Sequence, residues 1–139
     1  MRRHVAAGHN AAMHLIAIVA AVLAALIHVW FFVMESLWFM RPSVHGRFGL
    51  KTLEQATIVR SFAYNQGFYN LFLAIGVAIG LGLIWTGQRE AGRAIVFFAC
   101  GSMVAAGAVL VLHNSRFARA AAIQVGPALV AILAGWLLP

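Results

Sequence analysis

Residues 12–40 read AMHLIAIVAAVLAALIHVWFFVMESLWFM, and this stretch decides the fold class. It carries a single charged side chain, Glu35, within a run of apolar residues. A helix needs about 20 such residues to cross the hydrocarbon core of a bilayer. The stretch therefore predicts a membrane-spanning helix, and because it is longer than needed we expect it to tilt or to protrude.

The composition of the whole chain leads to the same class. Of 139 residues, 63% are hydrophobic, ten are Lys or Arg, and three are Asp or Glu. Soluble domains are about half apolar and about a quarter charged, and disorder requires low hydrophobicity. The net charge of +7 comes from basic residues in small groups between apolar runs. This pattern is typical of membrane-protein loops and not of a nucleic-acid-binding face, so we expect a lipid bilayer and no nucleic acid as partner.

Three further apolar runs have the length of a span: residues 58–85, 93–112 and 119–138. Pro42 cannot continue the first helix, and Gly87 closes the second. The loops after the second and third spans are short, which makes consecutive helices antiparallel neighbours. The sequence predicts an all-α, four-transmembrane-helix antiparallel bundle in one domain, 1–139. The one long connection, 41–57, is expected to lie partly in the membrane interface.

Basic residues weakly favour one orientation. The first and third loops carry six of them and the opposite side carries four, which favours a cytoplasmic first loop with both termini outside. Cys100 is the single cysteine, which excludes an intramolecular disulfide and dithiol chemistry, and we expect it to be a buried packing residue.

Twelve of the 13 charged residues lie in loops or at span edges, and the exception is Glu35. A carboxyl group inside a span is costly and marks a functional-site hypothesis. His28 precedes it by two helical turns on the same face. The second span opens with Tyr64-Asn65-Gln66-Gly67-Phe68-Tyr69-Asn70, and we expect its polar side chains to turn inward and find partners.

The expected depths of these residues group them in one half of the bundle. At 1.5 Å per residue, Glu35, Asn65 and Gln124 lie about 7–11 Å below the same membrane face. His28 and Asn70 lie deeper, at about 18 Å, and His113 lies close to the surface. The opposite half contains almost only Ala, Val, Leu, Ile and Gly.

Several interpretations of this grouping stay open. Glu35 is a protonated, hydrogen-bonded structural group, or the centre of a binding or proton-handling pocket, or a contact for a partner subunit. His28 and His113 differ too much in depth for a bis-His haem, and the spacing of His28, Glu35 and His113 does not suit a metal. No nucleophile–base motif is present. We therefore lean against an enzyme, assign no catalytic residue or metal ligand, and name no cofactor.

Two motifs together resemble a known family. They are His28-(six residues)-Glu35-Ser-Leu-Trp38 and Asn65-Gln66-Gly67-(one)-Tyr69-Asn70-Leu-Phe72-Leu73-Ala74. Both are similar to those of the Domain of Unknown Function 1304 family, and the resemblance runs from about Met13 to Trp136. It implies a compact bacterial four-helix membrane protein, which we expect in the inner (plasma) membrane, and it implies no established activity.

The sequence thus predicts a small multi-pass membrane protein with a polar intramembrane pocket centred on Glu35. The pocket would bind a small amphiphile, a lipid or quinone head group, or would handle protons or a solute. Its predicted ligand-binding residues are Glu35, His28, Asn65, Gln66, Tyr69, Asn70 and His113. The alternative is an accessory or assembly subunit of a larger membrane complex, and a homodimer is also open.

Overall fold

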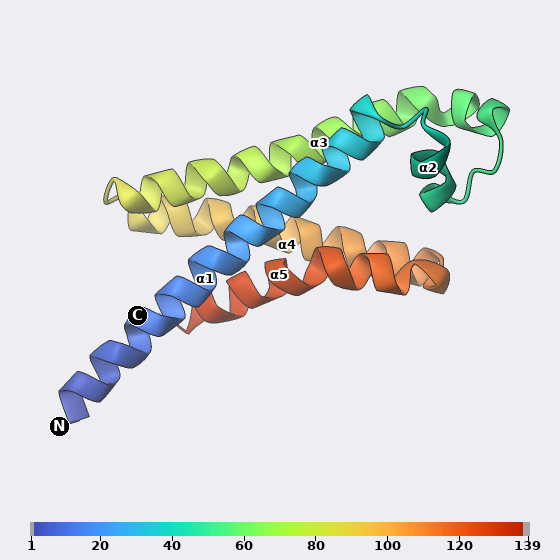
Figure 1. The fold of residues 1–139 in the computed structure, drawn as a ribbon. Helices are drawn as coiled ribbons and strands as arrows, with labels where there is room; N and C mark the ends of the chain where they lie inside the picture. Colours follow the sequence, from blue (N-terminus) through green and yellow to red (C-terminus); the bar gives the residue numbers. More distant parts are fainter. Residues whose placement is uncertain (1, 138–139) are drawn as a thin grey trace.

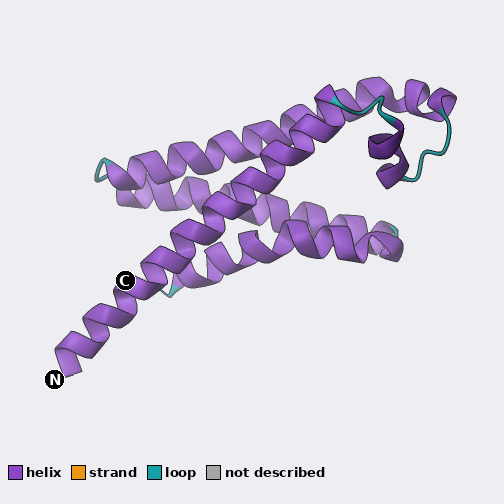
Figure 2. Cartoon of the chain, viewed as in Figure 1, coloured by secondary structure: helices purple, strands orange, loops and turns teal. Residues whose placement is uncertain are grey.

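A computed structural model describes residues 2–137 of the chain, with side chains from Asn10 onward (Figure 1). These residues form helices and connecting turns and no strand (Figure 2). The elements are α1 (Arg2–Phe32), the π-helical turn η1 (Val33–Leu37), α2 (Pro42–His45), the 3-10 turn η2 (Gly46–Phe48), α3 (Leu53–Trp85), α4 (Arg89–His113), the 3-10 turn η3 (Ser115–Phe117) and α5 (Ala118–Trp136).

The four long helices are arranged as an antiparallel ring. α3 packs between α1 and α4, and α5 packs against α4 and returns to α1 (Figure 1). We call the end that holds residues 38–52 and 114–117 the loop face. The α3–α4 turn and the two termini lie toward the other end (Figure 1).

Four segments are long and apolar enough to cross a membrane: Asn10–Leu37, Leu53–Trp85, Arg89–His113 and Ser115–Trp136. The predicted all-α bundle with four membrane-length helices is therefore confirmed, and the protein is a multi-pass membrane protein. Buried small side chains let its helices approach closely. A β-carbon on Gly80, for example, would come within 2.8 Å of the carbonyl oxygen of Gly92.

The first two helices depart most from the expected bounds. Helical structure in the first span ends at Leu37, before the expected residue 40, and α3 begins at Leu53 and not at residue 58. Thr52 starts α3 early through a capping box, in which its side chain accepts from the backbone of Gln55 and the Gln55 side chain accepts from the backbone of Thr52. The fourth helix ends at Trp136, and residue 138 of the expected span lies outside the described residues.

The long connection folds back as a compact hairpin instead of running as a loop. Gly49 adopts a positive φ of 82°, which only glycine does readily, and turns the chain toward α3. His45 holds the hairpin closed, because its Nδ1 hydrogen-bonds the carbonyl of Leu50 at 2.8 Å. Phe39 and Phe48 pack ring against ring, 5.7 Å apart.

Candidate functional site

Glu35 lies on a π-helical turn at the end of the first span. The backbone N–H of Trp38 donates to the carbonyl of Val33 at 2.9 Å, one residue further back than in an α-helix. Single π-turns of this kind are frequent at functional sites. This one directs two consecutive polar residues, Glu35 and Ser36, toward α3.

The carboxyl group of Glu35 is joined to Asn70 across the α1–α3 contact. Asn70 Nδ2 donates to Glu35 Oε2 at 2.8 Å. Asn70 is buried, with 7% of its surface exposed, and Glu35 is half-buried. Among the described residues, Asn70 is the only hydrogen-bond partner of Glu35, and no cation pairs with it. The carboxyl group therefore retains an oxygen that can bind another donor.

The next residue along the chain locks the same two helices together. Ser36 Oγ donates to the carbonyl of Tyr64 at 2.8 Å. The approach depends on Gly67, because a β-carbon there would collide with Ser36 Oγ and come within 3.1 Å of the β-carbon of Glu35. Gly67 therefore brings the Glu35 turn within reach of Asn70.

His28 lies fully buried in α1. Its Nδ1 is 2.8 Å from the carbonyl of Ala24. Because a carbonyl only accepts, Nδ1 carries the proton, and in the neutral ring Nε2 has a free lone pair. Nε2 is buried and has no hydrogen-bond partner. A buried polar atom of this kind calls for a donor such as a water molecule or a ligand hydroxyl.

The structure brings only part of the predicted set together. Glu35 and Asn70 are joined by a hydrogen bond, and His28 is buried. The other predicted residues are exposed: Asn65, Gln66, Tyr69 and His113. The expectation that every polar side chain at the start of the second span turns inward is therefore wrong for Asn65, Gln66 and Tyr69.

The length of α3 explains why these amides are exposed. α3 contains 33 residues, about 50 Å of helix, against a hydrocarbon core of about 30 Å. Trp85 is exposed at the far end of α3, a usual position for an interfacial anchor. Counting about 20 residues back from Trp85 reaches Asn65 and Gln66, which are then at the opposite interface and meet water or lipid head groups.

The expected depths also require correction. Glu35 hydrogen-bonds Asn70 and therefore lies level with it, although the sequence predicts Asn70 to lie deeper and Asn65 to lie level with Glu35. The cause is that α1 ends early and α3 starts early, so the first turns of α3 extend past the end of α1 (Figure 1). Gln124 is partly buried and donates to the carbonyl of Met103 at 3.2 Å, which ties α5 to α4.

The exposed polar residues continue a contact stripe between α3 and α4. A β-carbon on Gly76 would lie 3.6 Å from that of Ala99. Fourteen residues, or two heptads, from this contact, the same side of α3 carries Phe62 and the same side of α4 carries His113. Gln66 and Tyr69 lie between Phe62 and Gly76 on that side of α3. Phe62 and Tyr69 are nevertheless 77% and 58% exposed.

The exposure reflects a divergence of the two helices. α3 and α4 are joined at the turn after Trp85 and lie apart at the loop face (Figure 1). The contact is tight at Gly80 and Gly92 and no longer covers Tyr69. The side of α3 that carries Phe62, Gln66 and Tyr69, which we call the open stripe, is therefore left without helical cover.

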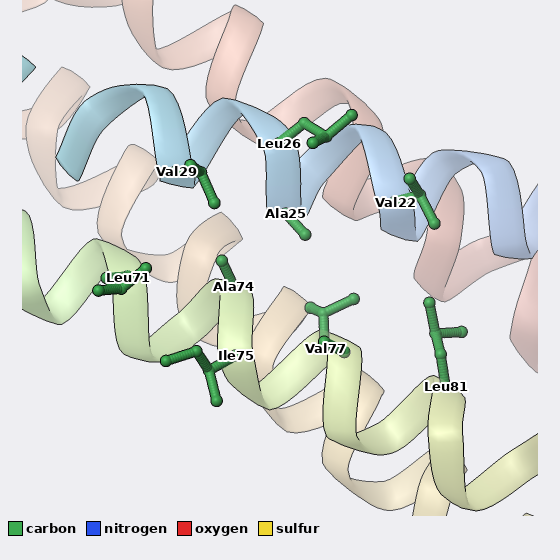
Figure 3. A pocket seen from close by; sticks show the side chains of 10 residues that line it. Val22, Ala25, Leu26, Val29, Leu71, Ala74, Ile75, Val77 and Leu81 are labelled. Atoms are coloured by element: carbon green, nitrogen blue, oxygen red, sulfur yellow. The ribbon is translucent and has the colours of Figure 1, made fainter. Parts of the chain in front are cut away.

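A groove lies on the outer side of the α1–α3 contact. It has a volume of about 320 Å³, and side chains of the two helices face each other across it (Figure 3). All of its lining residues are apolar; they include Val22, Ala25 and Val29 of α1 and Leu71, Ala74 and Ala78 of α3. The groove therefore differs from the polar pocket predicted around Glu35.

Two positions of the site gained their roles only in the structure. Ser36 and Gly67 appear in the sequence motifs, but their spacing gives no sign that one fills the space left by the other.

The second buried histidine, His45, lies outside this pair of helices. It is 4% exposed, and its buried Nε2 has no hydrogen-bond partner. Among the described residues, no three His, Cys, Asp or Glu side chains are grouped closely enough to hold a metal ion.

Comparison with known proteins gives one match. A family model described as "Protein of unknown function (DUF1304)" matches residues 22–136. The chain shows no significant similarity to a curated protein or to a solved structure. The matched segment reaches from α1 to Trp136 and contains both Glu35 and the Tyr64–Asn70 segment of α3. The chain therefore belongs to the DUF1304 family.

Proposed function

We propose that this protein is an inner (plasma) membrane protein of bacteria that binds a small amphiphile through Glu35 and Asn70. The observation that carries the proposal is the state of the Glu35 carboxyl group. It lies inside a span, half-exposed, with a single amide donor and with no cation among the described residues. A carboxyl group in that position is expensive to maintain and is usually functional.

The chemistry of the pair suits a polar head group. The free oxygen of an ionised carboxylate accepts from a hydroxyl or amine, and a protonated carboxyl donates to a carbonyl. Lipid head groups and quinones offer these groups, and a proton or a small polar solute would use the same oxygen. His28 supports the proposal from deeper in the bundle, because its Nε2 lacks a donor.

The route to Glu35 is from the loop face. Asn70 and Gln66 are four residues apart and lie on the same side of α3. The open stripe then leads from Tyr69 past Gln66 to the membrane interface. In this proposal Asn65, Gln66 and Tyr69 meet the head group as it enters, and His113 stands at the mouth on α4.

The test compares matched carboxyl variants in a mild detergent. Wild-type protein is titrated with a short-chain benzoquinone and with a short-chain monoacylglycerol while its melting temperature is recorded. A probe at 100 times its Kd would stabilise the fold by about 2.7 kcal/mol. We expect Glu35→Gln to melt like wild type without a probe and to lose the probe-induced shift, and Glu54→Gln, at the exposed start of α3, to keep it.

Two results would contradict the proposal. One is an unchanged probe response in Glu35→Gln. The other is equal loss of folding in Glu35→Gln and Glu35→Ala, which would make Glu35 a structural hydrogen-bonding group. Native mass spectrometry of freshly purified wild type adds an independent measurement, because a bound small molecule that is absent from Glu35→Gln would identify the natural ligand.

A second function, that of an accessory subunit in a membrane complex, is favoured by the open stripe. Phe62 and Tyr69 present a large exposed aromatic surface next to the amide of Gln66. Aromatic residues are enriched at protein interfaces, and amides hydrogen-bond between membrane helices. Purification in a mild detergent distinguishes the two functions. Stoichiometric partner chains that are lost from Tyr69→Ala support a subunit, and a lone monomer or homodimer opposes it.

A further inference from the structure

We propose that the groove between α1 and α3 binds one anionic phospholipid, with an acyl chain in the groove and its phosphate at Arg60. This site is separate from the one around Glu35. It lies on the lipid-facing side of the helix contact, where Val22, Leu26 and Ile75 are exposed (Figure 3).

The groove has the chemistry of a chain site. It lies wholly within the membrane-spanning segments, and its volume is about 320 Å³. Its lining offers no hydrogen-bond partner, and a water molecule needs at least two. Hydrocarbon is the medium that surrounds this surface, so an acyl chain is the occupant that restores the missing van der Waals contacts.

One stripe of α3 extends from the groove to a cation. The groove is lined on α3 by Ala78, Ile75 and Leu71, and the same side of the helix continues toward the loop face at Tyr64 and Arg60. The successive spacings are three, four, seven and four residues, which keep all five positions on one side of the helix. Tyr64 is 52% exposed, and its ring packs on Phe68. The stripe therefore passes from apolar to aromatic to basic toward the loop face.

The heights along this stripe match a phospholipid. With Trp85 at the far interface, the hydrocarbon core ends near Asn65. Tyr64 then lies at the interface, and Arg60 lies about 7 Å outside the core, among the head groups. Arg60 is exposed and pairs with no acidic residue that the structure describes. A guanidinium in this position binds phosphate through two parallel hydrogen bonds.

The charge around the stripe favours an anionic lipid. Described basic residues at the loop face are Arg41, Arg47, Lys51, Arg60, Arg116 and Arg119. All six are exposed, and apart from Glu35 the one described acidic residue near them is Glu54. Each basic residue near a membrane surface attracts anionic lipid by about 1 kcal/mol.

The test is lipid retention measured by native mass spectrometry. Protein in detergent is incubated with an equimolar mixture of phosphatidylglycerol and phosphatidylcholine, and the retained lipids are counted. We expect wild type to retain one phosphatidylglycerol. Arg60→Gln should lose about fivefold of its preference for that lipid over phosphatidylcholine, the equivalent of one basic residue. Ala78→Phe, which fills the groove, should retain neither lipid.

Matched variants control for general effects. Arg119→Gln removes an exposed charge from the same face, and Ala105→Phe adds a ring to an exposed position on α4. Both should retain one phosphatidylglycerol, and Arg119→Gln should lose less preference for it than Arg60→Gln, because Arg119 lies on α5 and not on the stripe of α3. The proposal is overturned if Ala78→Phe keeps its lipid, if Arg60→Gln and Arg119→Gln lose preference equally, or if wild type is a dimer that Ala78→Phe dissociates.

Discussion

The hydroxyl of Ser36 occupies the space in which a β-carbon on Gly67 would lie, and it donates to the carbonyl of Tyr64 one turn earlier on α3. The π-turn of the first span is thus pressed directly against the backbone of α3. This contact sets how far Glu35 is from Asn70, because both belong to the same pair of turns. The geometry of the candidate site therefore depends on a residue without a side chain.

Replacing Gly67 by alanine should separate the two helices. The new methyl group collides with Ser36, and overpacking of this kind costs about 1–3 kcal/mol. Thermal unfolding in detergent should show a lower melting temperature. Gly82→Ala is the matched control in the same helix, because nothing lies within 4 Å of its added β-carbon. A similar loss in both variants would show that the Ser36–Gly67 contact is not tight.

The hydrogen bond between Glu35 and Asn70 should appear as coupling in a double-mutant cycle. Interhelical hydrogen bonds in membrane proteins contribute about 0.6 kcal/mol on average and at most about 1.7 kcal/mol. We expect Glu35→Ala and Asn70→Ala to be coupled within this range when unfolding free energies are compared. The exposed Glu54 replaces Glu35 in the control cycle and should show no coupling to Asn70. Additive effects of Glu35→Ala and Asn70→Ala would contradict the bond.

Thr52 should stabilise the early start of α3. Loss of an N-cap side chain costs about 1 kcal/mol, so Thr52→Ala should lower the unfolding free energy by that amount. Amide hydrogen exchange should also become faster at Gln55, whose backbone N–H donates to the Thr52 hydroxyl. Thr57→Ala removes a hydroxyl that bonds only to the carbonyl of Leu53 within the same helix, and it should leave that exchange nearly unchanged. Equal exchange in both variants would show that the cap does not fix the start of the helix.

The sequence predicted the spans well and the site only in part, for identifiable reasons. Apolar length alone defines a membrane helix, so the four segments followed directly. The start of α3 was missed although Thr52 and Gln55 have capping-box spacing. A π-turn has no apolar pattern of its own, so the sequence does not reveal it. For this reason the predicted depth places Glu35 level with Asn65 instead of Asn70.

The sequence also did not predict which sides of α3 are covered by a neighbouring helix. Asn70 and Gln66 could be assigned to one side of α3 by spacing, but spacing does not show that α4 diverges from that side. The expectation of inward-turning side chains assumed a bundle that is equally closed at both ends. Exposed Tyr69 shows that the loop face is open.

Cysteine crosslinking should report this divergence directly. In a Cys100→Ala background, Gly76→Cys with Ala99→Cys should form a disulfide on mild oxidation, because the two β-carbons would be 3.6 Å apart. Disulfides form readily when β-carbons are about 3.5–4.5 Å apart. Phe62→Cys with His113→Cys, two heptads along the same two stripes, should remain reduced, because the helices lie apart at the loop face (Figure 1). Efficient crosslinking of this second pair would mean that α3 and α4 close along their full length in the membrane, which would cover the open stripe and remove the proposed route to Glu35.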